Sequence, residues 1–108
     1  MLVVNRFRSD AGTPDAAAQF AVELRAALDV LAEQRGYVDG RIGRNVDDPD
    51  LWVLTTTWQN VGSYRRALSA YEVKVSAVAI LSRALDEPSA YELVDGGDLN
   101  EARPRTLG

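Results

Sequence analysis

The stretch Leu51-Trp52-Val53-Leu54-Thr55-Thr56-Thr57-Trp58 decides the fold. Each of its residues is aromatic, β-branched or leucine, which is the composition typical of a β-strand. Successive side chains of a strand point to opposite faces, so this strand has two distinct sides. One side carries Trp52, Leu54, Thr56 and Trp58. Both sides are largely apolar, which predicts a sheet that is covered on both faces.

The segments before this strand predict two more strands. Leu2–Arg8 is rich in β-forming residues. Tyr37–Arg44 is a second strand, in which Gly40 and Gly43 weaken the pairing or mark a bulge. The segment Asn45–Asp50 has the composition of a turn, so we expect it to join Tyr37–Arg44 and residues 51–58 as an antiparallel hairpin.

Helices are predicted between and after these strands. Thr13-Pro14-Asp15 is typical of the start of a helix, and Gly36 is expected to end that helix. The apolar residues between them recur at helical spacing: Phe20, Leu24, Ala27, Leu28 and Leu31. Asn60 is expected to cap a second helix, and residues 72–86 continue the helical pattern, as one bent helix or as two. Ala90–Val94 is expected to be a short last strand.

This order predicts an α+β, ferredoxin-like split βαβ sandwich, in which helices cover one face of a four-stranded antiparallel sheet. The helices bury only one apolar face, and a second such face left in water usually marks an interface. We therefore expect a homodimer whose sheets pack face to face, with Trp52 at the contact. The alternative is that the tail folds back over the sheet. Residues 1–94 form the single domain of this interpretation, and residues 95–108 a polar C-terminal tail.

Composition removes several classes of function. The chain has 108 residues, of which 46% are hydrophobic and 26% charged, so we expect one soluble domain. It contains no cysteine and no histidine, which excludes thiol nucleophiles, zinc fingers, a histidine base and a histidine haem ligand. A net charge of −4 argues against nucleic acid as a partner. The chain has no apolar run of membrane-spanning length, and its start lacks the features of a secretory signal. We expect a cytoplasmic protein without a membrane partner.

Three segments in order resemble the antibiotic biosynthesis monooxygenase (ABM) family. Leu54–Trp58 with residues 59–64 resembles its strand-tryptophan-helix signature, Gly36–Gly40 its helix-to-strand turn, and Val3–Phe7 its opening strand. The resemblance covers roughly residues 2–94. It implies a ferredoxin-like subunit that pairs into a dimeric α+β barrel. It leaves the chemistry open, because one fold hosts many functions.

Two activities follow from this resemblance. Some members oxygenate hydroquinone-like or anthrone-like aromatics without metal or flavin. Others degrade haem with an asparagine on the first strand, a tryptophan in the second helix and an axial histidine. Asn5 matches that asparagine, but the tryptophan position falls near Ala67 and the histidine position near Ser76 or Ala77. Since the chain has no histidine, haem degradation of this type is disfavoured.

The candidate site residues are polar or aromatic side chains of an otherwise apolar pocket between sheet and helices. Asn5 would hydrogen-bond a phenolic or enolate oxygen, and Tyr64 and Tyr71 would offer phenols, as catalytic residues. Trp58 and Thr56 would bind the substrate. For each residue the alternative is packing or a local hydrogen bond. We expect no metal site, because Asp47, Asp48 and Asp50 fit a turn better than a calcium loop.

The function that fits these residues is a small cofactor-independent monooxygenase acting on electron-rich aromatic or quinol-type small molecules. A substrate anion would pass an electron to dioxygen inside a dry pocket, so that no cofactor is needed. The alternative is a non-catalytic dimeric module of the same fold that binds a small aromatic or apolar ligand. An isomerase or lactonase-like activity would require an acid–base residue in the pocket.

Overall fold

Strands and helices follow one another in the predicted order in the computed structural model, which describes residues 1–9 and 12–94. The strands are β1 (Leu2–Arg8), β2 (Tyr37–Arg44), β3 (Leu51–Trp58) and β4 (Ala90–Tyr91). The helices are α1 (Pro14–Ala32), α2 (Val61–Ser69), α3 (Tyr71–Ser76) and α4 (Val78–Leu81). The predicted tail, residues 95–108, lies outside the described residues.

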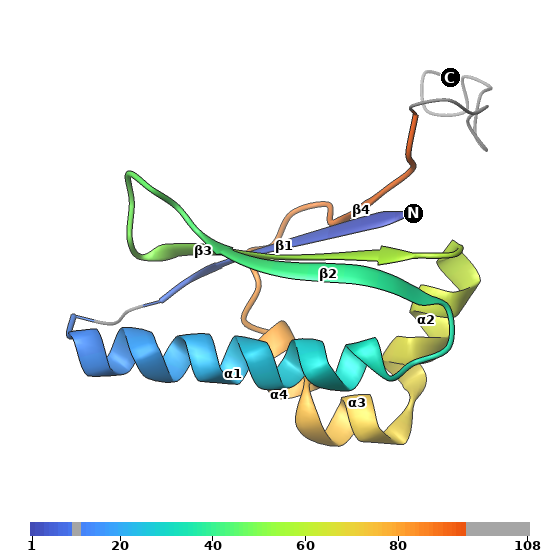
Figure 1. The fold of residues 1–108 in the computed structure, drawn as a ribbon, viewed down its shortest axis with the longest axis horizontal. Coiled ribbons are helices and arrows are strands. Elements are labelled where there is room, and N and C mark those ends of the chain that lie inside the picture. The colour runs from blue at the N-terminus through green and yellow to red at the C-terminus, as the bar shows by residue number, and fades with distance from the viewer. Residues whose placement is uncertain (10–11, 95–108) are drawn as a thin grey trace.

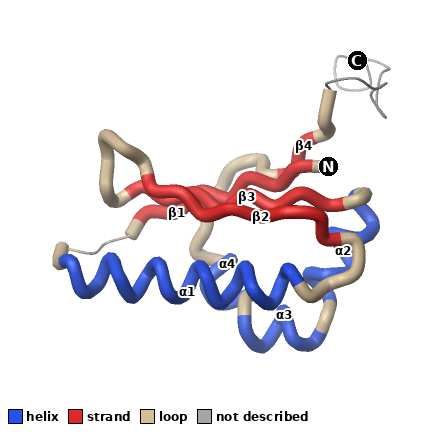
Figure 2. The backbone as a smooth tube through the Cα atoms, in the orientation of Figure 1, coloured by secondary structure: helices blue, strands red, loops and turns tan. Residues whose placement is uncertain are grey.

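The four strands form one antiparallel sheet in the order β2-β3-β1-β4. All the labelled helices lie on the same side of this sheet (Figures 1 and 2). The prediction of a ferredoxin-like α+β fold with helices on one face is therefore confirmed. β1 and β3 pair along their whole length, with Asn5 opposite Leu54 and Phe7 opposite Trp52.

The core lies between the sheet and the helices. On β1 and β3 the helix-covered face consists of Val3, Asn5, Phe7, Trp52, Leu54, Thr56 and Trp58. All of these are buried except Asn5, which is half-buried. From the other side α1 contributes the residues of its apolar stripe: Ala17, Phe20, Leu24, Ala27, Leu28 and Leu31. Burial of these side chains is the main favourable contribution to the stability of the fold.

The position of Trp52 corrects one prediction. Trp52 lies on the helix-covered face, where its ring meets that of Phe20 edge-on at 5.4 Å between centroids. It is therefore absent from the opposite, outer face, and its expected place at a dimer interface was wrong. The outer face of β1 and β3 consists of Leu2, Val4, Arg6, Arg8, Leu51, Val53, Thr55 and Thr57. In the described part of the chain no helix covers it (Figure 1).

The second helical region is shorter and more broken than the sequence predicts. α3 ends at Ser76, because Ala77 takes φ −126° and ψ −29°, which departs from helical geometry. α4 then ends at Leu81, so residues 82–86 are not helical. β4 spans two residues instead of the five predicted for 90–94. The chain thus crosses back to the sheet by a loop, which joins β1 where Leu85 N donates to Arg6 O at 2.7 Å.

The local signals at helix starts and turns are confirmed. The Thr13 side chain accepts from Ala16 N and the Asn60 side chain from Ser63 N, so both act as helix caps. The irregularity of β2 lies between Tyr37 and Asp39, and not at either glycine. The glycine at position 40 makes room for a neighbouring side chain, because a Cβ atom there would lie 2.6 Å from the Tyr37 hydroxyl. A side chain at position 40 would therefore displace the Tyr37 ring and the end of Leu28.

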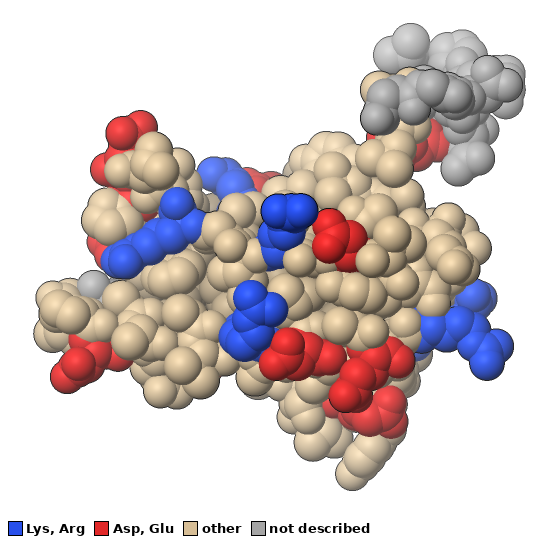
Figure 3. All heavy atoms as spheres, in the orientation of Figure 1, with Lys and Arg blue, Asp and Glu red and all other residues tan. Residues whose placement is uncertain are grey.

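The surface carries mixed charges. Basic and acidic side chains lie next to each other over the visible face (Figure 3). Several form exposed ion pairs, among them Arg83 with Glu23 at 3.5 Å. Such pairs contribute little to stability, because water screens them. In the described part of the chain no helix combines the length and the apolar character that crossing a bilayer requires.

Candidate functional site

Three of the predicted site residues, Thr56, Trp58 and Tyr64, are in contact at the end of β3. The Tyr37 ring meets the indole edge-on at a centroid distance of 5.6 Å, and the Tyr64 ring is tilted against it at 5.7 Å. We call Tyr37, Trp58 and Tyr64 the aromatic cluster. Tyr37 comes from β2 and Tyr64 from α2, so the cluster ties one end of the sheet to its covering helix.

Trp58 and Thr56 form a hydrogen bond with each other. The indole Nε1 donates to Thr56 Oγ1 at 2.8 Å, and both side chains are buried. Trp58 is only 1% exposed, with one tyrosine against its edge and another tilted against its ring. In this arrangement the indole has almost no free surface on which a substrate could stack.

The two tyrosines of the cluster keep their protons at neutral pH. Burial raises the pKa of the Tyr64 phenol above its usual value of 10. Burial also raises the pKa of Tyr37, and the nearby Asp39 carboxylate adds to the effect. A neutral phenol donates a hydrogen bond, so Tyr64 suits the stabilisation of a substrate oxygen better than the removal of a proton. Sequence reasoning missed Tyr37, although its pairing with Trp58 across the predicted hairpin was the signal that could have found it.

Asn5 is the half-buried amide of the helix-covered face. It lies opposite Leu54, and Thr56 is its diagonal neighbour on β3. Its amide has no hydrogen-bond partner among residues 1–9 and 12–94. Among those residues no fully buried side-chain nitrogen or oxygen lacks a partner, so the unpaired Asn5 amide keeps solvent-accessible surface. The Asn5 amide is therefore in contact with solvent, although it lines neither of the openings described below.

Tyr71 is separate from this arrangement. It is the first residue of α3, and 77% of its surface is exposed. The structure gives no contact between Tyr71 and the aromatic cluster. It places Asn5, Thr56, Trp58 and Tyr64 on or against one face of the sheet and leaves Tyr71 outside.

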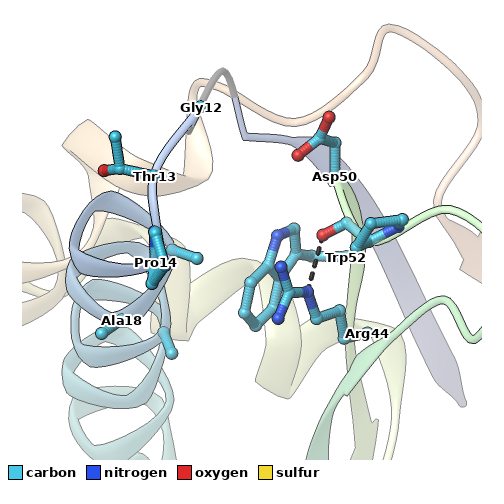
Figure 4. A pocket seen from close by; sticks show the side chains of 10 residues that line it. Gly12, Thr13, Pro14, Ala18, Arg44, Asp50 and Trp52 are labelled. Carbon is cyan, nitrogen blue, oxygen red and sulfur yellow. Dashed lines mark hydrogen bonds between the residues drawn. The ribbon is translucent and has the colours of Figure 1, made fainter.

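Two surface openings lie elsewhere in the structure. A cleft of about 530 Å³ opens at the other end of β3, between the start of α1 and the β2–β3 hairpin (Figure 4). We call it the Trp52 cleft. A second groove of about 360 Å³ runs between α1 and the α3–α4 region, with Glu23 and Arg83 among its lining residues. None of the predicted site residues lines either opening.

The chemistry available to the described residues is hydrogen bonding and packing. Residues 1–9 and 12–94 contain no group of three or more carboxylates arranged to hold a metal ion. Asn5 offers an amide, Tyr64 a protonated phenol, and the cluster offers rigid aromatic walls. Such groups orient a ligand and stabilise negative charge on one of its oxygens.

Solved structures similar to this one support the fold. SnoaB, a cofactor-independent oxygenase from Streptomyces nogalater solved as an asparagine-to-alanine variant, superposes with a TM-score of 0.67 at 23% identity, over 93% of this chain and 96% of its own. A candidate antibiotic biosynthesis monooxygenase from Deinococcus radiodurans gives a TM-score of 0.66 at 17% identity, over 92% of this chain and 98% of its own. Likeness at these identities concerns the fold alone.

Sequence comparison adds the family. No protein of curated function matches this sequence. The family model described as "Antibiotic biosynthesis monooxygenase" matches residues 1–76, which include β1, α1, the hairpin, α2 and α3. That match covers well over half of the chain and all of the aromatic cluster. The chain therefore belongs to the antibiotic biosynthesis monooxygenase (ABM) family.

Proposed function

We propose that this protein is a cofactor-independent monooxygenase acting on electron-rich aromatic, quinol-type small molecules. The observation that carries the proposal is the Asn5 amide, which is half-buried among apolar residues, has no partner among the described residues, and keeps some contact with solvent. Membership of the ABM family supports the reaction class. The oxygenase activity named for SnoaB is consistent with it, although that likeness concerns the fold.

The proposed role of Asn5 is to lower the pKa of the substrate. Its N–H₂ group donates to a phenolic or enolate oxygen and so stabilises the anion that forms there. Tyr64, which stays protonated because burial raises its pKa, is the second donor of this proposal. The substrate anion then transfers an electron to dioxygen. The protein holds the geometry and limits the access of water.

The overall reaction balances with dioxygen as the only oxidant. For an anthrone-type substrate, a ring CH₂ group becomes a carbonyl. One atom of dioxygen enters that carbonyl, and the other leaves as water with the two hydrogens. The carbon loses the four electrons that dioxygen gains, so no further reductant is needed.

The test is dioxygen consumption with a panel of hydroquinones and anthrones, in the presence of a metal chelator and without added flavin or haem. Turnover should exceed the spontaneous rate and fall about 10²-fold in Asn5→Ala, since one donor to a developing oxyanion contributes about that much. Tyr71→Phe is the matched control, because Tyr71 is 77% exposed and should leave the rate unchanged. Circular dichroism verifies that both variants fold. Unchanged turnover in Asn5→Ala would contradict the proposed role of Asn5 in the site.

A non-catalytic binding module of the same fold is the second candidate. The closed aromatic cluster favours it, because Trp58 is 1% exposed and its N–H is already paired. A cluster filled by its own side chains is a structural feature more than a substrate site. Absence of turnover across the whole panel, with folded protein, would put this candidate first.

We also propose that the protein acts as a homodimer through the outer face of the sheet. Val53 lies near the middle of that face and is half-buried although no described helix covers it. A two-fold pair of such sheets is self-complementary and would bury both apolar surfaces. Light scattering should give about twice the chain mass of 11.8 kDa, and Val53→Lys should give a monomer. Val22→Lys is the control, because Val22 is 60% exposed on α1. A monomeric wild-type protein would refute this proposal.

A further inference from the structure

The Trp52 cleft is a site that the proposed oxygenase does not use. Its volume of about 530 Å³ falls within the range of small-molecule sites. It lies at the end of β3 that carries Trp52, away from the aromatic cluster at the Trp58 end. Its lining residues come from two parts of the chain, the start of α1 and the β2–β3 hairpin (Figure 4).

One wall of the cleft is flat and the opposite wall is made of small side chains. The flat wall is the Trp52 indole, whose Nε1 donates to Ser9 Oγ at 3.0 Å; only 6% of this residue is exposed, because the Phe20 ring and the Arg44 guanidinium lie against it. Along α1 the facing residues are Pro14 and three alanines, Ala17, Ala18 and Ala21. No long side chain of α1 enters the space, which leaves room for a planar apolar group.

Arg44 gives the cleft a positive charge. Its guanidinium carbon lies 4.9 Å from the centre of the Trp52 ring, and its Nε donates to Pro49 O at 2.6 Å. These two contacts fix the plane of the guanidinium group (Figure 4). The described residues place no carboxylate within ion-pair distance of Arg44, whereas nearby Arg8 pairs with Asp48 at 2.8 Å. The two Nη groups of Arg44 are therefore available for a bidentate contact with a carboxylate.

Asp50 limits where an anion can sit. It lies at the edge of the opening, on the side of the hairpin, with Thr13 across from it (Figure 4). Its carboxylate repels a negative group close to it, so the favourable position for an anion is away from Asp50 and beside Arg44. The carboxylate makes no hydrogen bond or ion pair to another described residue, and its charge is thus free to act on a ligand.

We propose that the Trp52 cleft binds a planar aromatic carboxylate. The aromatic ring lies in the space beside the Trp52 indole and the α1 alanines, and the carboxylate accepts two hydrogen bonds from the Nη groups of Arg44. This binding is independent of the proposed oxygenase reaction, because neither Trp52 nor Arg44 takes part in that reaction.

The two tryptophans provide a direct experiment. In ¹⁵N-labelled protein each indole N–H gives one signal, so Trp52 reports on the cleft and Trp58 on the aromatic cluster. Titration with 2-naphthoate should shift the Trp52 signal and leave the Trp58 signal in place. The neutral isostere 2-naphthamide should bind at least about tenfold more weakly, because it lacks the charge-assisted pair. Equal affinity for the two compounds, or a shift of Trp58 alone, would overturn the proposal.

Three variants sharpen the test. Arg44→Gln should weaken 2-naphthoate binding at least about tenfold. Arg41→Gln is the matched control on the same strand, because Arg41 does not line the cleft and should bind the probe like the wild type. Asp50→Asn should strengthen binding, since it removes the repulsion at the rim. Unchanged affinity in Arg44→Gln would refute the assignment of Arg44, and weaker binding in Asp50→Asn would refute the proposed position of the carboxylate.

Discussion

Trp52 and Trp58 occupy the same face of the same strand but have different surroundings. Both rings are buried, and both indole N–H groups donate to a hydroxyl, Ser9 Oγ for Trp52 and Thr56 Oγ1 for Trp58. Trp58 is enclosed by two tyrosines. Trp52 packs on Phe20 on one side and lines an open cleft beside Arg44 on another.

The difference follows from what the helices supply at each end. Over Trp58, α2 contributes the Tyr64 ring, and β2 contributes Tyr37, which lies across Gly40. Over Trp52, α1 contributes the Phe20 ring, but its residues that face the cleft are Pro14 and three alanines, which are too small to fill the space. One end of β3 is therefore a closed core, and the other end is a wall of a potential ligand site.

The largest effect is expected from deleting each indole. Trp58→Ala should lower the free energy of unfolding by about 4–5 kcal/mol, because the cavity it leaves is enclosed on all sides. Trp52→Ala should cost about 3 kcal/mol, since part of its surroundings is already open. Urea unfolding measures both values. If Trp58→Ala does not fold, Trp58→Phe and Trp52→Phe should keep the same order. An equal or reversed order would contradict the contrast between a closed and an open end.

The glycines beside the two ends form a matched pair. Gly36 has φ +90°, and a Cβ atom there would collide with the Ser63 side chain. Gly36→Ala should therefore cost about 2–4 kcal/mol, from backbone strain and crowding. Gly12, beside the Trp52 cleft, would have no atom within 4 Å of an added Cβ apart from those of its chain neighbours. Gly12→Ala should change stability by less than about 0.5 kcal/mol. The same unfolding experiment contradicts this prediction if the two variants are equally stable.

The sequence was sufficient to predict the sheet because alternation and turn composition are local signals. Residues 51–58 form β3 with the predicted alternation of faces, and the caps at Thr13 and Asn60 act as predicted. Which face the helices cover is not a local property. Both faces of β3 are apolar, and only the packing of α1 against Trp52 decides between them. The break at Ala77 was hidden for the same reason, because the apolar spacing continues through it.

The candidate site could be predicted only in part. The strand alternation predicted that Trp58 and Thr56 lie on the same face, but it could not predict that they form a hydrogen bond with each other. Tyr71 has the right chemistry and helical position, yet it points into solvent at the start of α3. The Trp52 cleft could not be predicted, because it forms where the side chains of α1 are too small to fill the space. In the sequence, the alanines of α1 indicate only a helix, and nothing local shows that the β2–β3 hairpin lies opposite them.

A smaller effect is expected from removing the hydroxyl that pairs with each indole. Thr56→Val should cost about 1–2 kcal/mol, because the buried Trp58 N–H is then left without an acceptor. Ser9→Ala should cost less than half of that, since water from the open end can reach the Trp52 N–H in its place. Urea unfolding gives the two values, and hydrogen exchange of the indole N–H groups gives a local measure. A larger cost for Ser9→Ala would mean that the Trp52 end is as closed to water as the other.

The smallest expected effect is a difference in pH dependence between the two ends. At the Trp52 end, the hydrogen bond from Arg8, together with the backbone N–H of Asp50, lowers the pKa of Asp48. A lowered native pKa stabilises the fold above the unfolded pKa, and this contribution is lost as the pH falls through the native value. At the Trp58 end, burial raises the pKa of Tyr64. That contribution is present below the unfolded pKa and is lost as the pH rises through the native value.

Acid should therefore loosen the Trp52 end first, and alkali the Trp58 end. Unfolding free energies measured from roughly pH 3 to pH 11 should fall less steeply in acid for Asp48→Asn and less steeply in alkali for Tyr64→Phe. The two indole N–H signals provide the local measure, because each belongs to one end. If both signals respond to acid and alkali together, the ends of β3 open as one unit. The closed and open environments of its two tryptophans would then share a single cooperative stability.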